Sequence, residues 1–175
     1  MDPRLVWEEN NVCPSCRNRT FNIKIYYYEI PQGPLNLIVS KCSSCGFSFR
    51  DVVPLWEGEG KRIELKVENM EDLSSKVFRG PNGRVLIPEL GVEIEPGPYS
   101  QGYLGTVDGI IEDILEITQR ECEGRGDDGC RKAIERIEKA LRGELNFTLI
   151  IEDHTGLSFI ISKKARVEVI KKEEN

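Results

Sequence analysis

Two pairs of cysteines near the N-terminus are the residues best suited to chemistry. Cys13 and Cys16 stand in "CPSC", and Cys42 and Cys45 stand in "KCSSCGF". A CxxC turn places two thiolates on one side of a metal ion, and a second pair carried back by a hairpin completes a tetrahedron. The spacing therefore predicts one Zn²⁺ bound by all four cysteines. Two disulfides are the alternative, which an intracellular setting disfavours.

The predicted zinc site is structural. Four protein ligands fill the coordination sphere of a tetrahedral zinc ion, so no coordination position is left for water or for a substrate. Gly46 follows the second cysteine pair, where a residue that accepts a positive φ helps backbone amides to point at the sulfurs. We therefore expect the metal to organise the chain and not to catalyse a reaction.

Residues 1–52 are expected to form a zinc ribbon around this site. "FNIKIYYY" alternates with period two and predicts a strand, and "PQGP" predicts a turn. "LNLIVS" is a second short strand that leads into the second cysteine pair, and "FSFRDVV" is a candidate third. The two cysteine pairs thus lie at the ends of strands.

Residues 53–175 predict a β-rich domain of barrel or sandwich type with an inserted helical hairpin. Short strands such as "RIELKV", "RVLIPEL" and "GVEIEPG" alternate with glycine and proline. Residues 105–143 instead show the spacing of two amphipathic helices separated by "GRGDDG". "FTLIIED", a turn at "HTG" and "LSFIIS" then predict a β-hairpin, and "RVEVI" a last strand. The fold class is mainly β with α.

Cys122 and Cys130 fall at the end of the first predicted helix and the start of the second. They could be buried thiols that pack as small apolar side chains, or they could form a disulfide. A second metal site is a third alternative. We favour free thiols and keep a Cys122–Cys130 disulfide as a possible pairing.

The remaining sequence favours binding over catalysis. The net charge of −6 opposes binding to a phosphate backbone, although several cations flank the cysteine pairs and keep a nucleic-acid-binding ribbon as the alternative. These cations are Arg17, Arg19, Lys24, Lys41 and Arg50.

His154 is the only histidine, and neither a Walker loop nor a nucleophile elbow is present. We expect a cytoplasmic protein that is neither an enzyme nor bound to a membrane.

Several sequence blocks in series resemble one protein family. After the two cysteine pairs come "GKRIELKVENMEDLSSKVF", "IPEL", "GTVDGIIEDI" and "FTLIIEDHTGLSFI". Their order and spacing resemble the ZPR zinc-finger family in its single-module archaeal form, from about residue 13 to residue 161. The resemblance implies a four-cysteine zinc finger joined to a domain of double-stranded β-helix type that carries a helical hairpin.

The same resemblance implies a partner. Family members bind translation elongation factor one-alpha and resemble dedicated folding helpers for that GTPase. Aromatic residues anchor protein interfaces, so Phe47, Phe49 and Trp56 are candidate contacts, although they could instead pack the finger against the β-rich domain. This chain departs from the family where Gln32 and Gly33 replace the aromatic pair that often follows "IP". Finger contacts that use those aromatics, and contacts to kinases, are therefore not expected to transfer.

Overall fold

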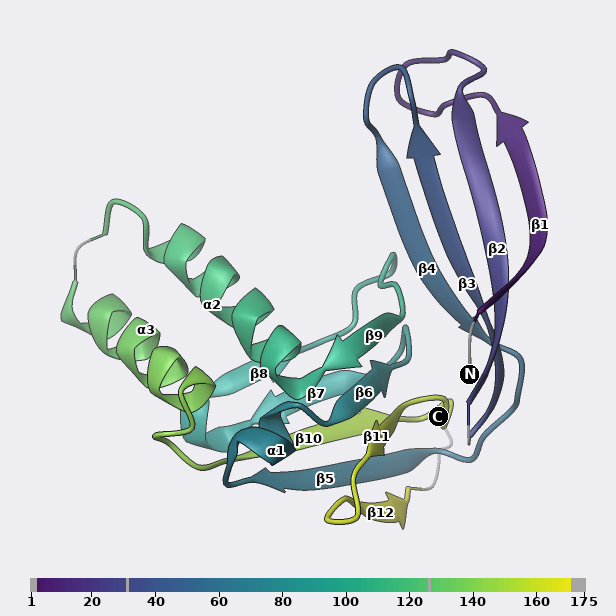
Figure 1. The fold of residues 1–175 in the computed structure, drawn as a ribbon. Coiled ribbons are helices and arrows are strands. Elements are labelled where there is room, and N and C mark those ends of the chain that lie inside the picture. Colours follow the sequence, from purple (N-terminus) through teal and green to yellow (C-terminus); the bar gives the residue numbers. More distant parts are fainter. Residues whose placement is uncertain (1–2, 31, 126, 171–175) are drawn as a thin grey trace. The chain divides into compact units, whose positions relative to one another are not determined.

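The computed structural model describes residues 3–30, 32–125 and 127–170 (Figure 1). The chain forms two compact units. The first, called the finger, comprises residues 1–57 together with residues 101–103. The second, called the β-domain, comprises residues 58–100 and 104–175.

The finger is one antiparallel sheet in the order β1-β2-β3-β4. Its strands are β1 Arg4–Asn11, β2 Phe21–Ile30, β3 Gly33–Cys42 and β4 Ser48–Pro54. The period-two alternation of residues 21–28 predicted β2, which pairs with β3 so that Phe21 lies opposite Cys42. The sequence did not predict β1, because "RLVWEENN" does not alternate and all eight of its residues are exposed.

The β-domain contains a five-stranded sheet in the order β12-β5-β10-β7-β8 and a three-stranded sheet in the order β11-β6-β9. The larger sheet comprises β5 Lys61–Val67, β7 Arg84–Ile87, β8 Val92–Ile94, β10 Phe147–Asp153 and β12 Arg166–Val169. The smaller comprises β6 Lys76–Arg79, β9 Tyr103–Thr106 and β11 Phe159–Ile161, and two short helical turns are α1 Met70–Leu73 and η1 Pro88–Leu90. Alternate residues of β5, β7 and β10 are at most 1% exposed and form the core: Ile63, Leu65, Val85, Leu149 and Ile151.

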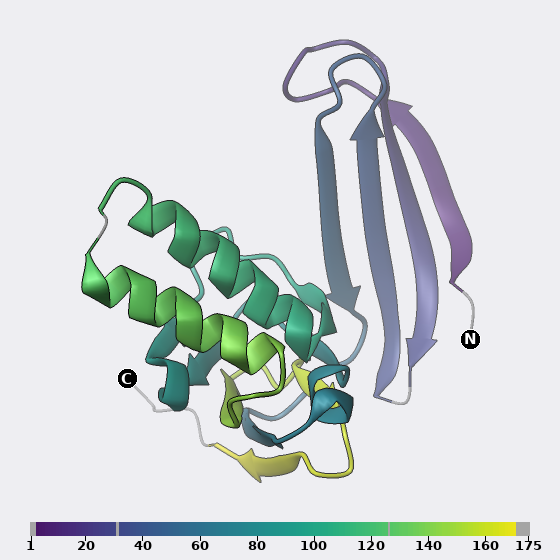
Figure 2. The ribbon, with the colours of Figure 1, turned by 60° about the vertical axis from the view of Figure 1, so that its left-hand side comes forward.

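The inserted helical pair is confirmed. It consists of α2 Val107–Cys122 and α3 Asp128–Leu141, which lie side by side in both views (Figures 1 and 2). Helix α2 buries the stripe Val107, Ile110, Ile111 and Ile114. The side chain of Asp127 caps α3 by accepting a hydrogen bond from Cys130 N at 2.8 Å. No helix in the described part of the chain is long and apolar enough to cross a membrane.

The predicted hairpin between β10 and β11 is wrong. Both sides of β10 are already occupied, by β5 and by β7, and β11 pairs with β6. The buried carboxylate of Asp153 accepts a hydrogen bond from Ser158 N at 2.8 Å. Ser158 Oγ in turn accepts from Gly80 N, directly after β6, at 2.8 Å. These bonds hold the loop after β10 against the end of β6, so the next strand continues into the other sheet.

Candidate metal centre

The two cysteine pairs form matching tight turns at one end of the finger sheet. Arg17 N donates to Cys13 O at 2.9 Å, and Gly46 N donates to Cys42 O at 3.0 Å. The residue after each pair has a positive φ, 64° at Arg17 and 77° at Gly46. The sequence indicated this role for Gly46 but not for Arg17, because a non-glycine residue rarely adopts that conformation.

The turns bring the four cysteine sulfurs together. All four Sγ atoms lie within 4.8 Å of one another. Cys13 Sγ is 3.7 Å from Cys45 Sγ, and Cys16 Sγ is 3.6 Å from Cys42 Sγ. A tetrahedral ZnS₄ site with Zn–S bonds of about 2.3 Å has sulfurs about 3.8 Å apart. The cluster therefore fits a single structural Zn²⁺ coordinated only by protein.

The hydroxyl group of Thr20 favours the thiolate form of Cys42, the form in which a cysteine binds zinc. Thr20 Oγ1 lies 3.3 Å from Cys42 Sγ and 2.8 Å from Ser44 Oγ. The hydrogen bond from Thr20 is the main cause that lowers the pKa of the Cys42 thiol to about 6. Sequence reasoning missed Thr20, although its position between the first turn and β2 places it beside the second turn.

Phe47 and Phe49, two of the three aromatic contact candidates, lie close to the cysteine cluster. Phe21 is buried against it, and Phe49 packs on the same group. The Phe47 ring lies 5.7 Å from that of Phe21, yet Phe47 remains 38% exposed. Near the cluster, Phe49 therefore packs inward while Phe47 faces solvent.

The third candidate, Trp56, lies at the other end of β3. Gly33, the first residue of that strand, has a φ of 140°, and a Cβ added there would come within 3.0 Å of Trp56 Cε3. The indole thus packs on the start of β3. The three aromatic residues that the sequence singled out do not form one group.

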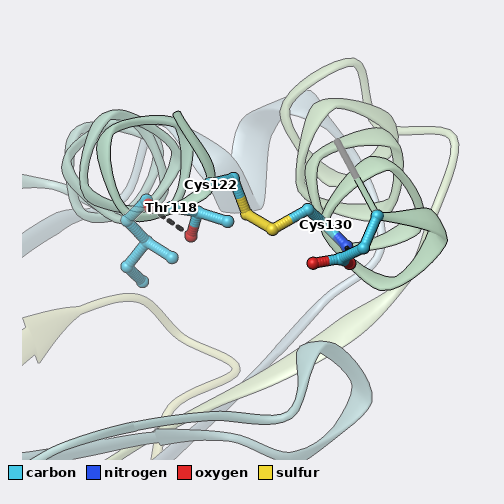
Figure 3. The surroundings of a disulfide bond; sticks show 5 residues. Thr118, Cys122 and Cys130 are labelled. Carbon is cyan, nitrogen blue, oxygen red and sulfur yellow. Dashed lines mark hydrogen bonds between the residues drawn. A yellow bond between two sulfur atoms is a disulfide. The ribbon is translucent and has the colours of Figure 1, made fainter. Parts of the chain in front are cut away.

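Cys122 and Cys130 form a disulfide that joins the end of α2 to the start of α3 (Figure 3). The Cα atoms are 5.6 Å apart, within the range that a disulfide spans. The preference for free thiols is thereby corrected. The sequence allowed both, because spacing alone does not give the angle between two helices. This bond belongs to the β-domain and is separate from the zinc cluster.

Comparison with known proteins decides the family. A family model described as the ZPR1 jelly-roll domain matches residues 71–174. The chain belongs to the ZPR1 family. It is 35% identical over 168 residues to a ZPR1-like protein of Methanocaldococcus jannaschii, covering 93% of this chain and 85% of the relative. A second ZPR1-like protein, from Pyrococcus horikoshii, is 30% identical over 171 residues, or 93% and 77% of the two chains.

A eukaryotic ZPR1 relative carries a functional name. It is the zinc finger chaperone zpr1 of Schizosaccharomyces pombe, 29% identical over 174 residues. The match covers 92% of this chain but 36% of that relative. The chain thus spans about a third of the length of that relative.

Proposed function

We propose that this protein is a zinc-dependent binding module that recognises translation elongation factor one-alpha and assists its folding. Two observations together support the proposal. The chain belongs to the ZPR1 family, and its four cysteines would fill all four coordination positions of one zinc ion. Such a site has no open position for chemistry, so its effect is exerted through the surface that it shapes.

The zinc end of the finger offers a surface suited to a protein partner. Phe47 and Val12 are both exposed large apolar residues beside the cysteine turns. Four cations lie near the cysteines in the sequence: Arg17, Arg19, Lys41 and Arg50. Residues 12–28 and 30–50 contain no carboxylate, and Glu8 of the neighbouring strand β1 pairs with Lys24. An aromatic anchor with these cations nearby in the sequence fits an acidic surface on the partner.

The proposal is tested by refolding purified archaeal elongation factor one-alpha from denaturant in the presence of the zinc-loaded chain. We expect a higher yield of GTP-binding factor, and no increase when zinc has been removed. Phe47→Ala should weaken binding to the factor at least tenfold, as loss of an interface anchor does. Tyr99→Ala is the matched control, because Tyr99 is 94% exposed in the β-domain and should leave binding unchanged.

Unchanged binding by a Phe47→Ala chain that still holds one zinc ion would contradict the assignment of this surface. A wild-type chain that neither binds the factor nor raises its refolding yield would overturn the proposed function itself.

A nucleic-acid-binding zinc ribbon is the second candidate, and the excess of cations within residues 12–28 and 30–50 favours it. Binding to nucleic acid releases counterions, so its affinity falls steeply with salt in proportion to the phosphates contacted. Titration of a fluorescent RNA oligonucleotide at 50, 100 and 200 mM salt distinguishes the candidates. Tight RNA binding with a steep salt dependence, together with no binding of the factor, would select this one.

A further inference from the structure

Strand β12 is an open edge of the five-stranded sheet. Within the described residues it pairs on one side only, with β5 (Figure 1). All four of its residues are exposed. An open edge presents free backbone N–H and C=O groups to which another strand can add.

The valines of β12 lie on the core side of the sheet without being covered. Val167 is opposite Ile63, which is 1% exposed and belongs to the core. Residues directly opposite in an antiparallel pair point to the same face, yet Val167 is 60% exposed and Val169 is 68% exposed. The core layer therefore stops before β12, where the side chains of Val167 and Val169 are exposed to solvent.

The direction of the backbone groups along β12 follows from one hydrogen bond. Ile170 N donates to Gly60 O at 2.8 Å. In an antiparallel ladder, hydrogen-bonded residues alternate with residues whose groups point the other way. The groups of Arg166 and Glu168 therefore face β5, and those of Val167 and Val169 face the open edge.

We propose that a second copy of this chain pairs with β12, antiparallel and with a twofold axis at Val167. In this register Val167 lies opposite the partner's Val167, and its outward N–H and C=O groups bond to the same groups of the partner. The exposed valines then lie at the centre of a continuous ten-stranded sheet, formed from the two five-stranded sheets.

Charge complementarity selects this register. On the outer face, Arg166 lies opposite Glu64 and Glu168 lies opposite Arg62 within one chain. Pairing at Val167 places Arg166 opposite the partner's Glu168, so the charges alternate in sign from strand to strand across the interface. Cross-strand pairs of opposite charge stabilise a sheet, whereas like charges directly opposite destabilise it.

Neighbouring registers lack this match. A shift of two residues in one direction places Arg166 opposite the partner's Arg166, and a shift in the other places Glu168 opposite the partner's Glu168. A shift of one residue sets outward backbone groups against inward ones and moves the valines to the other face. The pairing centred on Val167 is the one that satisfies both the backbone and the charges.

Cysteine cross-linking tests the register. In hydrogen-bonded antiparallel pairs the Cα atoms are about 5.5 Å apart, within disulfide range. Val167→Cys should therefore form a covalent dimer under mild oxidation of the zinc-loaded chain. Val169→Cys is the matched control, because its two copies would be about 13 Å apart along the strands and should not cross-link. Equal cross-linking of both variants, or none with Val167→Cys, would overturn the proposal.

Sedimentation over a concentration series tests the pairing without a cross-link. The wild-type chain should become dimeric as concentration rises. Val167→Pro removes the outward N–H and leaves the bonds to β5 in place, since proline is tolerated at the open side of an edge strand. It should stay monomeric with its far-ultraviolet circular dichroism unchanged, while Val167→Thr, which retains the N–H, should still dimerise. A wild-type chain that remains monomeric throughout, or a proline variant that dimerises like the wild type, would contradict the interface.

Discussion

The finger and the β-domain are both built mainly from antiparallel strands, but different forces hold them together. The β-domain encloses side chains such as Phe78 and Leu149, which are completely buried. The described residues of the finger form a single sheet. Apart from cysteines, they bury only a few large apolar residues, among them Leu35 and Val52. A short segment with so little core needs another source of stability, and the four-cysteine cluster supplies it.

This difference indicates how the two units should respond to perturbation. Metal binding to a small zinc module is coupled to its folding, because the site does not exist in the unfolded chain. The stability of the β-domain depends instead on the apolar area that it buries and on close packing. Changes at the sulfurs and changes in the core should therefore have separable effects.

Removal of zinc should have the largest effect, confined to the finger. Structural zinc contributes apparent binding free energies of about 10–16 kcal/mol in small zinc modules. A chelator, or Cys42→Ser, should cause amide signals of β2, β3 and the cysteine turns to collapse in an NMR spectrum, while those of β10 persist. If the finger signals survive with no bound metal, the cluster does not organise the finger.

A cavity in the β-domain should have the next largest effect and should spare the metal site. Phe78 is fully buried, and its ring lies 5.5 Å from that of Phe159. Phe78→Ala should lower the free energy of unfolding of the β-domain by about 3–5 kcal/mol, measured by urea denaturation. Zinc stoichiometry should stay at one per chain, and a parallel loss of zinc would show that the units are not independent.

Loss of the Cys122–Cys130 disulfide should cost less. The bond closes a loop with a sequence separation of 8, for which loop-closure entropy predicts roughly 2–3 kcal/mol. The double variant Cys122→Ser/Cys130→Ser should melt at a lower temperature in calorimetry, with faster amide exchange at the ends of α2 and α3. Reduction of the wild-type chain by a dithiol should reproduce the shift, and a variant with an unchanged melting temperature would argue against the bond.

The smallest effect is expected at the residue that follows each cysteine pair. Arg17 adopts the left-handed conformation that Gly46 adopts at the equivalent position, and this conformation strains a residue with a Cβ. Arg17→Gly should increase zinc affinity by up to about 1 kcal/mol, measured by competition with a chromogenic chelator. Gly46→Ala is the opposite change and should lower the zinc affinity. A Cβ added at Gly46 has no atom within 4 Å outside its chain neighbours, so the strain of the backbone is the cause that remains. Shifts of the same sign in both variants would contradict this explanation.

Local patterns predicted the elements that local physics controls. The period-two alternation of residues 21–28 and the helical spacing within residues 105–143 each predicted an element that the structure contains. The spacing of the cysteines predicted a cluster that fits zinc, since two CxxC turns on adjacent strands have few other ways to bring four sulfurs together. Strand β1 was missed because all eight of its residues are exposed, so neither of its faces had to be apolar and the sequence does not alternate.

The sequence by itself thus determined the mainly β architecture, the helical insertion and a four-sulfur site for one metal ion, because each is encoded in the spacing of neighbouring residues. The tertiary structure alone decided that β11 pairs with β6 and not with β10, that Cys122 bonds to Cys130, and that Phe47 rather than Phe49 faces solvent. Those outcomes depend on which distant surfaces are already occupied: β10 has a neighbour on each side, and the cysteine cluster covers one aromatic ring and not the other.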